Sequence, residues 1–163
     1  MTTDLGHFTI RPIAPGDAAD IAVMVAELSR HEGAPPPLIV AQDVETELAR
    51  PDCVLQGHMA LQGKRAVGYA LFTISFDTES GARGAYMCDL YVRQEARRNG
   101  LGRTLVAAIA RETAAQGGTW IAWGVLAKNE EAQRFYAKLG RPEEGVQLWS
   151  ISNQVFAQMK AAL

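Results

Sequence analysis

Apolar residues recur along this chain with two different periods, and each period predicts its own kind of element. Ile21, Met24, Val25 and Leu28 follow one another at helical spacing, which places them on one face of a helix. Residues 8–11 instead alternate apolar and polar side chains, as in a half-buried strand. The chain therefore contains both helices and strands, and the pattern favours an α/β (α+β) fold.

The helical pattern returns several times, with signals that mark where a helix begins or ends. Asp17 is suited to the N-cap of the first helix, and Gly33 to the position after its end. Further helices are predicted over residues 40–48, 100–116, 130–139 and 153–163. In the last of these, Val155, Phe156 and Met159 are expected to face inward.

Strand-like segments lie between these helices. They are predicted over residues 54–61 and 66–76, joined as a hairpin by residues 62–65, and over residues 86–92, 119–126 and 147–151. The order strand, helix, strand between residues 86 and 126 predicts a right-handed crossover between two parallel strands. Because the sequence contains no repeat, low-complexity tract or linker, we expect a single domain over residues 1–163.

Composition narrows the class of protein. A chain of 163 residues, 48% hydrophobic and with a formal net charge of −2, fits a globular domain and argues against a nucleic-acid partner. The sequence has no apolar run of membrane-spanning length and no signal peptide, so we expect a cytoplasmic protein without a membrane partner. Cys53 and Cys88 are expected to remain thiols, and the scattered histidines predict no metal site.

The segment that follows residues 86–92 carries the clearest chemistry. Arg97, Arg98 and Arg103 surround Gly100 and Gly102, where the helix of residues 100–116 begins. Glycines let a ligand approach the backbone, and the first N–H groups of a helix have no partners within it. With the positive end of the helix dipole, these groups suit a phosphate. The same residues also fit a plain helix start with closely packed glycines and solvated arginines, so both interpretations stay open on this segment alone.

The order of the elements and two paired motifs resemble the GNAT superfamily of N-acetyltransferases over nearly the whole chain. The motifs are Arg97-x-x-Gly100-x-Gly102 after the fourth strand, and Asn129, Ala132, Phe135, Tyr136 and Gly140 after the fifth. The resemblance implies the GNAT acyl-CoA N-acyltransferase fold, a mixed sheet of about six to seven strands flanked by about four to five helices. Residues 28–32, 67–72, 89–92 and 147–149 look like segments of the diamine (spermidine/spermine and thialysine) acetyltransferase branch.

This resemblance implies acetyl-CoA as the cosubstrate and assigns residues to its parts. The backbone of residues 90–92 would pair with the pantetheine arm like an added strand. The helix start would bind the pyrophosphate, and Asn129 would hydrogen-bond the cosubstrate near its amide groups. The implied cofactor-binding residues are Leu90, Tyr91, Val92, Arg97, Arg98, Asn99, Gly100, Leu101, Gly102, Arg103, Asn129 and Tyr136.

Tyr136 is the catalytic residue that the resemblance implies, as the donor of a proton to the departing thiolate. A phenol suits this role because the ordinary pKa values of a phenol and a thiol lie within a few units of each other. On its position alone, next to Phe135 on an amphipathic helix, Tyr136 fits an aromatic residue packed in the core better than a catalytic one. The family pattern favours the catalytic role.

The candidate substrate-binding residues are Glu32, Cys88 and Asp89. Glu32 lies in the last turn of the first helix, where it is either a solvated charge or a carboxylate at the rim of a pocket for a cation. In the diamine branch a glutamate usually precedes the aspartate of the fourth strand, and Cys88 stands there in this chain. A neutral thiol cannot hold an ammonium or take its proton as a carboxylate does, so Asp89, or Glu32 through water, becomes the alternative base. Strand alternation puts Asp89 on the face of Tyr91 and Cys88 on the other face unless a bulge intervenes.

The sequence thus predicts an N-acetyltransferase that transfers an acetyl group from acetyl-CoA to a primary amine of a small molecule in a direct ternary complex. The amine would be a polyamine, a diamine or an amino-acid-like compound. Two alternatives remain: an enzyme of the same fold acting on a protein or aminoglycoside amine, and a CoA-binding module without turnover. The resemblance also suggests a homodimer.

Overall fold

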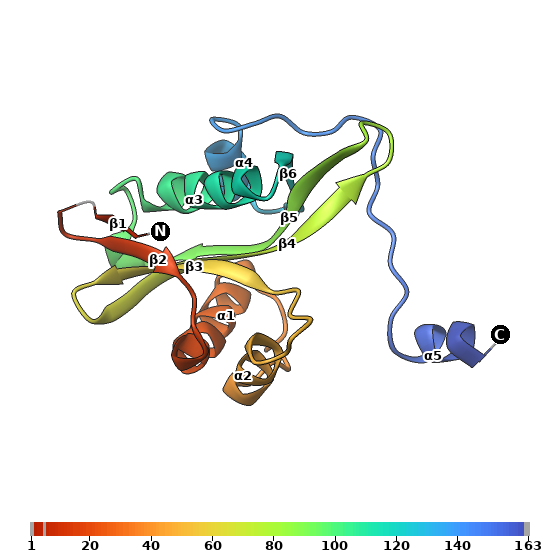
Figure 1. Ribbon diagram of the computed structural model, residues 1–163, viewed down its shortest axis with the longest axis horizontal. Helices are drawn as coiled ribbons and strands as arrows, with labels where there is room; N and C mark the ends of the chain where they lie inside the picture. The colour runs from red at the N-terminus through yellow and green to blue at the C-terminus, as the bar shows by residue number, and fades with distance from the viewer. Residues whose placement is uncertain (1, 5, 162–163) are drawn as a thin grey trace. The chain divides into compact units, whose positions relative to one another are not determined.

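The computed structural model describes residues 2–4 and 6–161 of the chain (Figure 1). These residues form two compact units, one up to Asn129 and one from Glu130 onward. The first unit contains the whole β-sheet and three α-helices, and the second contains two α-helices.

The first unit is organised around a six-stranded sheet in the order β1-β2-β3-β4-β5-β6. The strands are β1 (Thr3–Asp4), β2 (Thr9–Pro12), β3 (Gln56–Gln62), β4 (Arg65–Asp77), β5 (Ala82–Val92) and β6 (Gly118–Trp123). Neighbouring strands are antiparallel except β5 and β6, which are parallel. The mixed sheet and the parallel pairing predicted from the sequence are thus confirmed.

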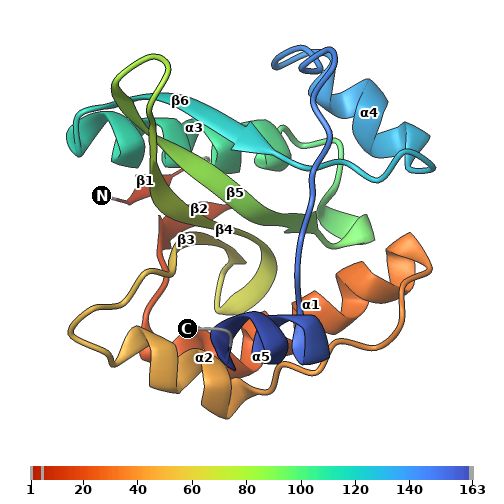
Figure 2. The same cartoon turned by 90° about the vertical axis from the view of Figure 1, so that its right-hand side faces the viewer.

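Helices cover both faces of this sheet. Helices α1 (Ala18–Glu32) and α2 (Ala41–Leu48) lie on one face, and α3 (Leu101–Ala115) lies on the other (Figures 1 and 2). Gly33 follows α1 in the left-handed conformation, with φ 64°, as a helix C-cap that glycine adopts without steric cost. The end of α1 predicted from Gly33 is therefore confirmed.

The side of the sheet that faces α1 and α2 holds one part of the core. Ile21 and Met24 of α1 and Val44 of α2 are buried in one cluster with Tyr69 and Leu71 of β4. The apolar stripe read from the sequence is therefore the buried face of α1. Burying a side chain of this size contributes roughly 1.5–3 kcal/mol.

The opposite face of the sheet packs against α3. Leu101, Leu105 and Ile109, which recur at helical spacing, are all buried there. On the sheet, His58 of β3 is 4% exposed, and its ring stacks on Phe72 of β4 with 6.1 Å between centroids. Burial lowers the pKa of the His58 imidazole, although the Glu112 charge acts in the opposite direction.

Asp17 occupies the N-cap position of α1, as predicted, but its side chain makes no capping hydrogen bond to that helix. It ends the 3₁₀ turn Pro15–Asp17 with helical backbone angles, so its carboxylate points back along the chain. There it accepts a hydrogen bond from the Ala14 N–H (2.8 Å) and two from the Arg11 guanidinium (2.7 Å each). The guanidinium holds the pKa of Asp17 below its usual range. Asp17 therefore joins β2 to the start of α1.

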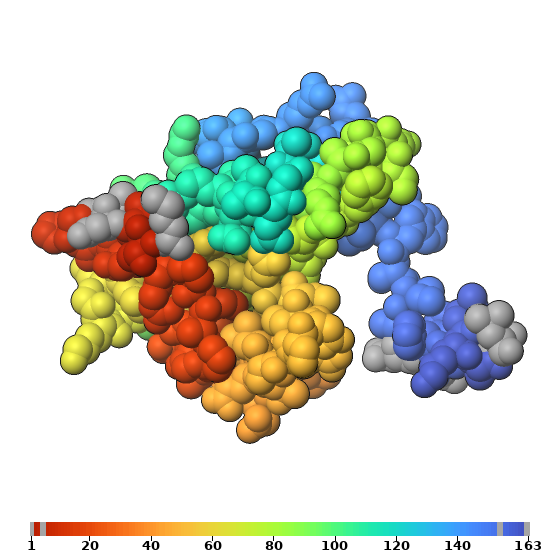
Figure 3. Space-filling view, viewed as in Figure 1, coloured from red at the N-terminus to blue at the C-terminus, as the bar shows by residue number. Residues whose placement is uncertain are grey.

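The hairpin of β4 and β5 is longer than the sequence predicts. β5 starts at Ala82 rather than Tyr86, so the connecting loop is confined to residues 78–81, where Gly81 has φ 62°. In the space-filling view the end of this hairpin, in yellow-green, projects beyond α3 (Figure 3). β6 is shorter than predicted, because it ends at Trp123 rather than at residue 126.

The second unit contains α4 (Glu130–Tyr136) and α5 (Asn153–Ala161). Residues 147–151 have no regular secondary structure, so the strand predicted there is wrong. A strand needs a neighbour for its backbone N–H and C=O groups, and the described part of this unit contains no other strand. Val155, Phe156 and Met159 are 50–59% exposed, so their predicted inward orientation is wrong as well. The last two residues of the predicted closing helix lie outside the described residues.

An ion pair connects α1 to the end of β5. The Arg93 guanidinium donates to both carboxylate oxygens of Glu27, at 3.0 and 3.1 Å, and also to the carbonyl of Ala66 at 2.8 Å. The side chains of Glu27 and Arg93 are only 22% and 14% exposed. The helix that carries Glu32 is thereby fixed to the strand that carries Asp89.

Two further properties of the described part of the chain bear on its class. None of the helices described is long and apolar enough to cross a membrane. Within residues 2–4 and 6–161, no group of three or more His, Cys, Asp or Glu side chains could hold a metal ion.

We predict that His58 makes stability depend on pH. Its pKa is lower in the folded state than its ordinary value, so the unfolded chain binds more protons as the pH falls. Stability is fully present above the unfolded pKa of about 6.5 and declines below it. In thermal denaturation between pH 7.5 and 5, His58→Phe should lose less of its Tm than the unaltered protein. His7→Phe, at an exposed position, should follow the unaltered protein; identical curves for all three would contradict the prediction.

We predict that the α1–β5 ion pair is worth more than an exposed pair. Glu27→Gln should lower the free energy of unfolding by about 1–3 kcal/mol, because it leaves the enclosed Arg93 charge without its partner. Glu95→Gln breaks the exposed pair with Arg65, whose N–O distance is 2.6 Å, and should cost less than about 1 kcal/mol. Urea denaturation measures both values. Equal losses would show that the degree of burial does not set the contribution of these pairs.

Candidate functional site

The two parallel strands part in the middle of β5. β6 pairs with β5 only from Arg83 to Met87, whereas β5 continues to Val92. From Cys88 to Val92, the side of β5 away from β4 faces no other described strand. We call this stretch the open edge of β5.

The register shows which backbone groups point to the open edge. The Arg93 N–H donates to the Val67 carbonyl at 2.8 Å, so this pair is hydrogen-bonded across the two strands. Because bonded and non-bonded pairs alternate in an antiparallel ladder, Tyr91 also faces β4, whereas Leu90 and Val92 turn their N–H and C=O groups outward. The Val92 carbonyl accepts a hydrogen bond from Arg97 Nε at 2.9 Å. An extended ligand with amide groups could pair with the remaining groups as an added strand does.

A β-bulge lies at the start of the open edge. Leu71 of β4 pairs with Asp89, but the adjacent Phe72 pairs with Met87, so Cys88 is the extra residue. Met87 therefore shares the α3 face of the sheet with Phe72, and Asp89 shares the α1 face with Leu71. Asp89 lies on the same face as Tyr91, as alternation predicts, while the bulge removes Cys88 from the register.

Cys88 itself has modest chemistry. Its side chain is exposed, and its thiol donates a long hydrogen bond to the Tyr86 carbonyl, 3.8 Å away. Partial desolvation and the adjacent Asp89 charge raise the pKa of the thiol. A raised pKa keeps the sulfur protonated and weakens it as a nucleophile.

Carboxylates and tyrosines gather beside the bulge on the α1 face. The hydroxyl of the fully buried Tyr69 lies 3.4 Å from Asp89 Oδ2, and the Tyr69 ring is 6.4 Å from that of Tyr91. Glu32, the last residue of α1, is close enough for its charge to raise the pKa of Tyr69. We call these four residues the acidic–aromatic cluster. It brings together two of the predicted substrate residues, Glu32 and Asp89.

The cluster also alters the acidity of Asp89. Burial raises the pKa of the Asp89 carboxyl above its ordinary value, and the hydrogen bond with Tyr69 acts in the opposite direction. A carboxylate with a raised pKa takes up a proton more readily than an exposed aspartate does. This is the property that a general base requires near neutral pH.

The chain beyond β5 forms a turn suited to an anion. After the 3₁₀ turn Gln94–Ala96, Arg98 and Gly100 both adopt positive φ, 65° and 77°. A tight backbone turn of this kind can present N–H groups to an anion. α3 begins directly after Gly100, and its first turn contains Arg103 but no acidic residue. The positive end of the helix dipole is thus left without a carboxylate of its own helix.

Two residues of this turn are tied to the backbone. Asn99 Nδ2 donates to the carbonyls of Ala96 and Arg97, each at 3.3 Å. The Arg97 guanidinium, bonded to Val92, also lies 6.0 Å from the centre of the Tyr91 ring. These contacts hold residues 98–103, which we call the anion turn, next to the open edge.

The remaining predicted residues lie after β6. The Asn129 N–H donates to the Leu126 carbonyl at 2.8 Å and closes a turn at the end of the first unit. Tyr136 belongs to the second unit, where its half-buried ring meets the Phe135 ring edge-on at 5.1 Å. The first unit thus contains all the candidate residues except Tyr136.

The sequence pattern does not mark three residues around the candidate site at β5: Tyr69, Glu27 and Arg93. The alternation of β4, with Tyr69 and Leu71 on one face, was the one available signal for Tyr69. The partnership of Glu27 with Arg93 joins residues 66 positions apart, and no local pattern marks such a pair.

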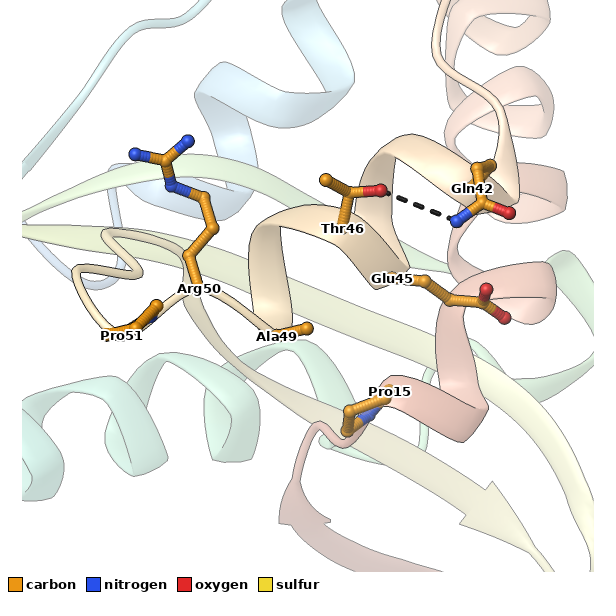
Figure 4. Close-up of a pocket in the computed structure, with 7 residues that line it drawn as sticks. All are labelled: Pro15, Gln42, Glu45, Thr46, Ala49, Arg50 and Pro51. Atoms are coloured by element: carbon orange, nitrogen blue, oxygen red, sulfur yellow. Dashed lines mark hydrogen bonds between the residues drawn. The ribbon is translucent and has the colours of Figure 1, made fainter.

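A separate groove of about 610 Å³ lies along α2 (Figure 4). Its lining residues are Pro15, Gln42, Glu45, Thr46, Ala49, Arg50 and Pro51. None of the candidate site residues contributes to it, and its polar side chains include a Gln42–Thr46 hydrogen bond along the helix surface. The groove is therefore distinct from the site at β5.

Comparison with solved structures supports the fold. An integron cassette protein from the mobile metagenome of V. cholerae has a TM-score of 0.77 at 19% identity, covering 94% of this chain and 98% of its own. An aminoglycoside acetyltransferase from an uncultured soil metagenomic sample, in complex with trehalose, has a TM-score of 0.76 at 17% identity, covering 92% and 99%.

The amino-acid sequence gives the family. Residues 21–140 match the Acetyltransferase (GNAT) family. The thialysine N-epsilon-acetyltransferase of Bos taurus is 28% identical over 144 residues, which cover 80% of this chain and 82% of that protein. This relative belongs to the branch that the sequence motifs resemble. The chain is therefore a member of the GNAT acetyltransferase family and an acetyl-transferring enzyme.

Proposed function

We propose that this enzyme transfers the acetyl group of acetyl-CoA to the primary amine of a small molecule, by direct attack within a ternary complex. The observation that carries the proposal is the position of the acidic–aromatic cluster beside the open edge of β5. One strand thereby offers backbone groups for an acyl carrier and a carboxylate for an amine. Both are needed within a few ångströms of the same carbonyl carbon.

The residues of the first unit fit the parts of acetyl-CoA. The outward N–H and C=O groups of Leu90 and the N–H of Val92 suit the amides of the pantetheine arm. The anion turn, from Arg98 to Arg103, suits the pyrophosphate. Asn129 would add a hydrogen bond near the amide groups, as the family pattern implies. When bound, acetyl-CoA supplies a thioester carbonyl and a thiolate leaving group.

Asp89 is the proposed general base. The ordinary pKa of a primary ammonium is near 10.4, so the amine must lose a proton before its nitrogen can attack. Asp89 accepts this proton, directly or through water, and the nitrogen lone pair then forms the new bond to the carbonyl carbon. Glu32 adds negative charge at the rim and favours a cationic acceptor.

Tyr136 is the proposed general acid. It donates its phenolic proton to the sulfur as the carbon–sulfur bond breaks, so the thiolate leaves as a neutral thiol. The acylated nitrogen then loses its second proton, through water, to the phenolate, which restores the phenol. Two things support this role: the position of Tyr136 in the family motif, and the closeness of the ordinary pKa values of a phenol and a thiol.

The acceptor that we propose is a diamine, a polyamine or an amino-acid-like amine. The bovine relative, named for thialysine, supports an amine at the end of a short chain. The likeness to an aminoglycoside acetyltransferase supports the second candidate, an aminoglycoside amine. The other alternative from the sequence, a CoA-binding module without turnover, does not agree with the membership of this chain in an acetyl-transferring family. The replacement of the usual glutamate by Cys88 is instead taken as a change in how the acceptor amine is held.

We also propose a cytoplasmic homodimer. In the second unit, large apolar side chains such as Leu148 and Trp149 are 84% and 85% exposed, which is costly for a monomer in water. A second copy of the chain would cover them.

The proposed function predicts thiol release from acetyl-CoA with some members of an amine panel of diamines, lysine analogues, peptides and aminoglycosides. Asp89→Asn should lower kcat/KM by about 10²–10⁴, because the amide cannot accept the proton. Asp52→Asn, at an exposed aspartate paired with Arg50, should keep full activity. No thiol release across the panel, together with tight CoA binding, would contradict a small-molecule amine as the acceptor.

The acid role predicts that Tyr136→Phe lowers kcat by about 10²-fold or more and leaves CoA binding nearly unchanged. The matched control is Tyr86→Phe, which removes the same hydroxyl from a partly exposed tyrosine of β5 before the bulge. Steady-state kinetics and CoA titration measure the two effects. Full turnover by Tyr136→Phe at neutral pH would exclude the acid role.

A further inference from the structure

Tyr69 lies directly beside Asp89, the proposed base, and takes no part in the proton transfers proposed for Asp89 and Tyr136. It is fully buried, its ring packs in the core beneath α1, and its hydroxyl lies 3.4 Å from Asp89 Oδ2. A buried hydroxyl in an apolar core is costly unless it has a partner. The Asp89 carboxylate is that partner.

The register explains how the two groups meet. Without the bulge at Cys88, residues 87 and 89 would lie on the same face of the sheet. With it, Asp89 moves opposite Leu71, and its carboxylate lies within reach of Tyr69, two residues along β4 on the same face. Asp89 is also the one acidic residue in the sequence of β5. The bulge therefore places the Asp89 carboxylate on the α1 face, and Tyr69 contacts that carboxylate there.

We propose that Tyr69 is a positioning residue, whose hydroxyl donates to Asp89 Oδ2 and holds that carboxylate toward the acceptor amine. The inference rests on the proposed function and extends it. One carboxylate oxygen is fixed by Tyr69, so the other is left for the ammonium or for a bridging water. A lone aspartate with a fixed orientation thus does the work for which the diamine branch has a glutamate at the position of Cys88.

The hydrogen bond between Tyr69 and Asp89 also affects the pKa of the Asp89 carboxyl. Burial raises the pKa of the carboxyl, and the donated hydrogen bond lowers it by stabilising the ionised form. The other groups that face this region are Glu32 from α1, Tyr91 and Cys88 from β5. Among these groups, Tyr69 is the one whose hydrogen bond with the Asp89 carboxylate favours its ionised form. Loss of the hydroxyl should therefore move the protonation of Asp89 to higher pH.

The test is the pH profile of Tyr69→Phe, which keeps the ring and removes only the hydroxyl. We expect the acid limb of kcat/KM to move to higher pH, with an activity loss of about tenfold near pH 6 and a much smaller loss near pH 9. The KM for acetyl-CoA should stay unchanged. Tyr86→Phe should reproduce the profile of the unaltered enzyme. A purely structural role would lower the Tm of Tyr69→Phe without moving the acid limb, and that result would overturn the inference.

A double variant separates this inference from the proposed function. In an Asp89→Asn background, Tyr69→Phe should cause no further pH-dependent loss, because its effect acts through the carboxylate. If Asp89→Asn is fully active, the base assignment fails and the inference fails with it. If Asp89→Asn is impaired but Tyr69→Phe leaves the pH profile in place, the proposed function stands and the role of Tyr69 alone is rejected.

Discussion

The separation of β6 from β5 after Met87 is the constraint on which the rest of the site depends. Up to that residue, β5 is hydrogen-bonded on both sides, and beyond it one side faces no described strand. The bulge at Cys88 lies at the same point and reverses the faces of the residues that follow. The open edge and the placement of Asp89 on the α1 face thus both begin at the same point of one strand. The α1–β5 ion pair then fixes the helix that closes this region.

Much of the fold could be predicted from the sequence because the elements are locally encoded. The spacing of Ile21 and Met24 predicts the buried face of α1, and Gly33 its end, since both depend only on near neighbours. The start of α3 directly after Gly100 is encoded by near neighbours as well. The extended residues 147–151 have strand composition but no regular structure, because a strand also requires a partner that composition does not supply.

The details of the site were harder to predict, because they depend on register. A single extra residue in β5 decides which side chains Asp89 can meet, and no letter of the sequence marks Cys88 as a bulge. In the sequence, Tyr69 is an aromatic residue within the predicted strand 66–76, and no local pattern indicates that its hydroxyl meets a carboxylate 20 residues away. The sequence therefore predicted the identity of the candidate carboxylates better than it predicted their partners.

Arg98 shows what such a site costs the fold. It adopts φ 65°, a conformation that glycine reaches easily and that costs an ordinary residue roughly 1–2 kcal/mol. Gly100, two residues later, has the same sign of φ without that penalty. A sequence selected for stability alone would place a second glycine at position 98. With arginine at this position, the turn combines a positive charge at a fixed point with a costly backbone conformation, so replacing Arg98 with glycine would remove the charge and the backbone cost together.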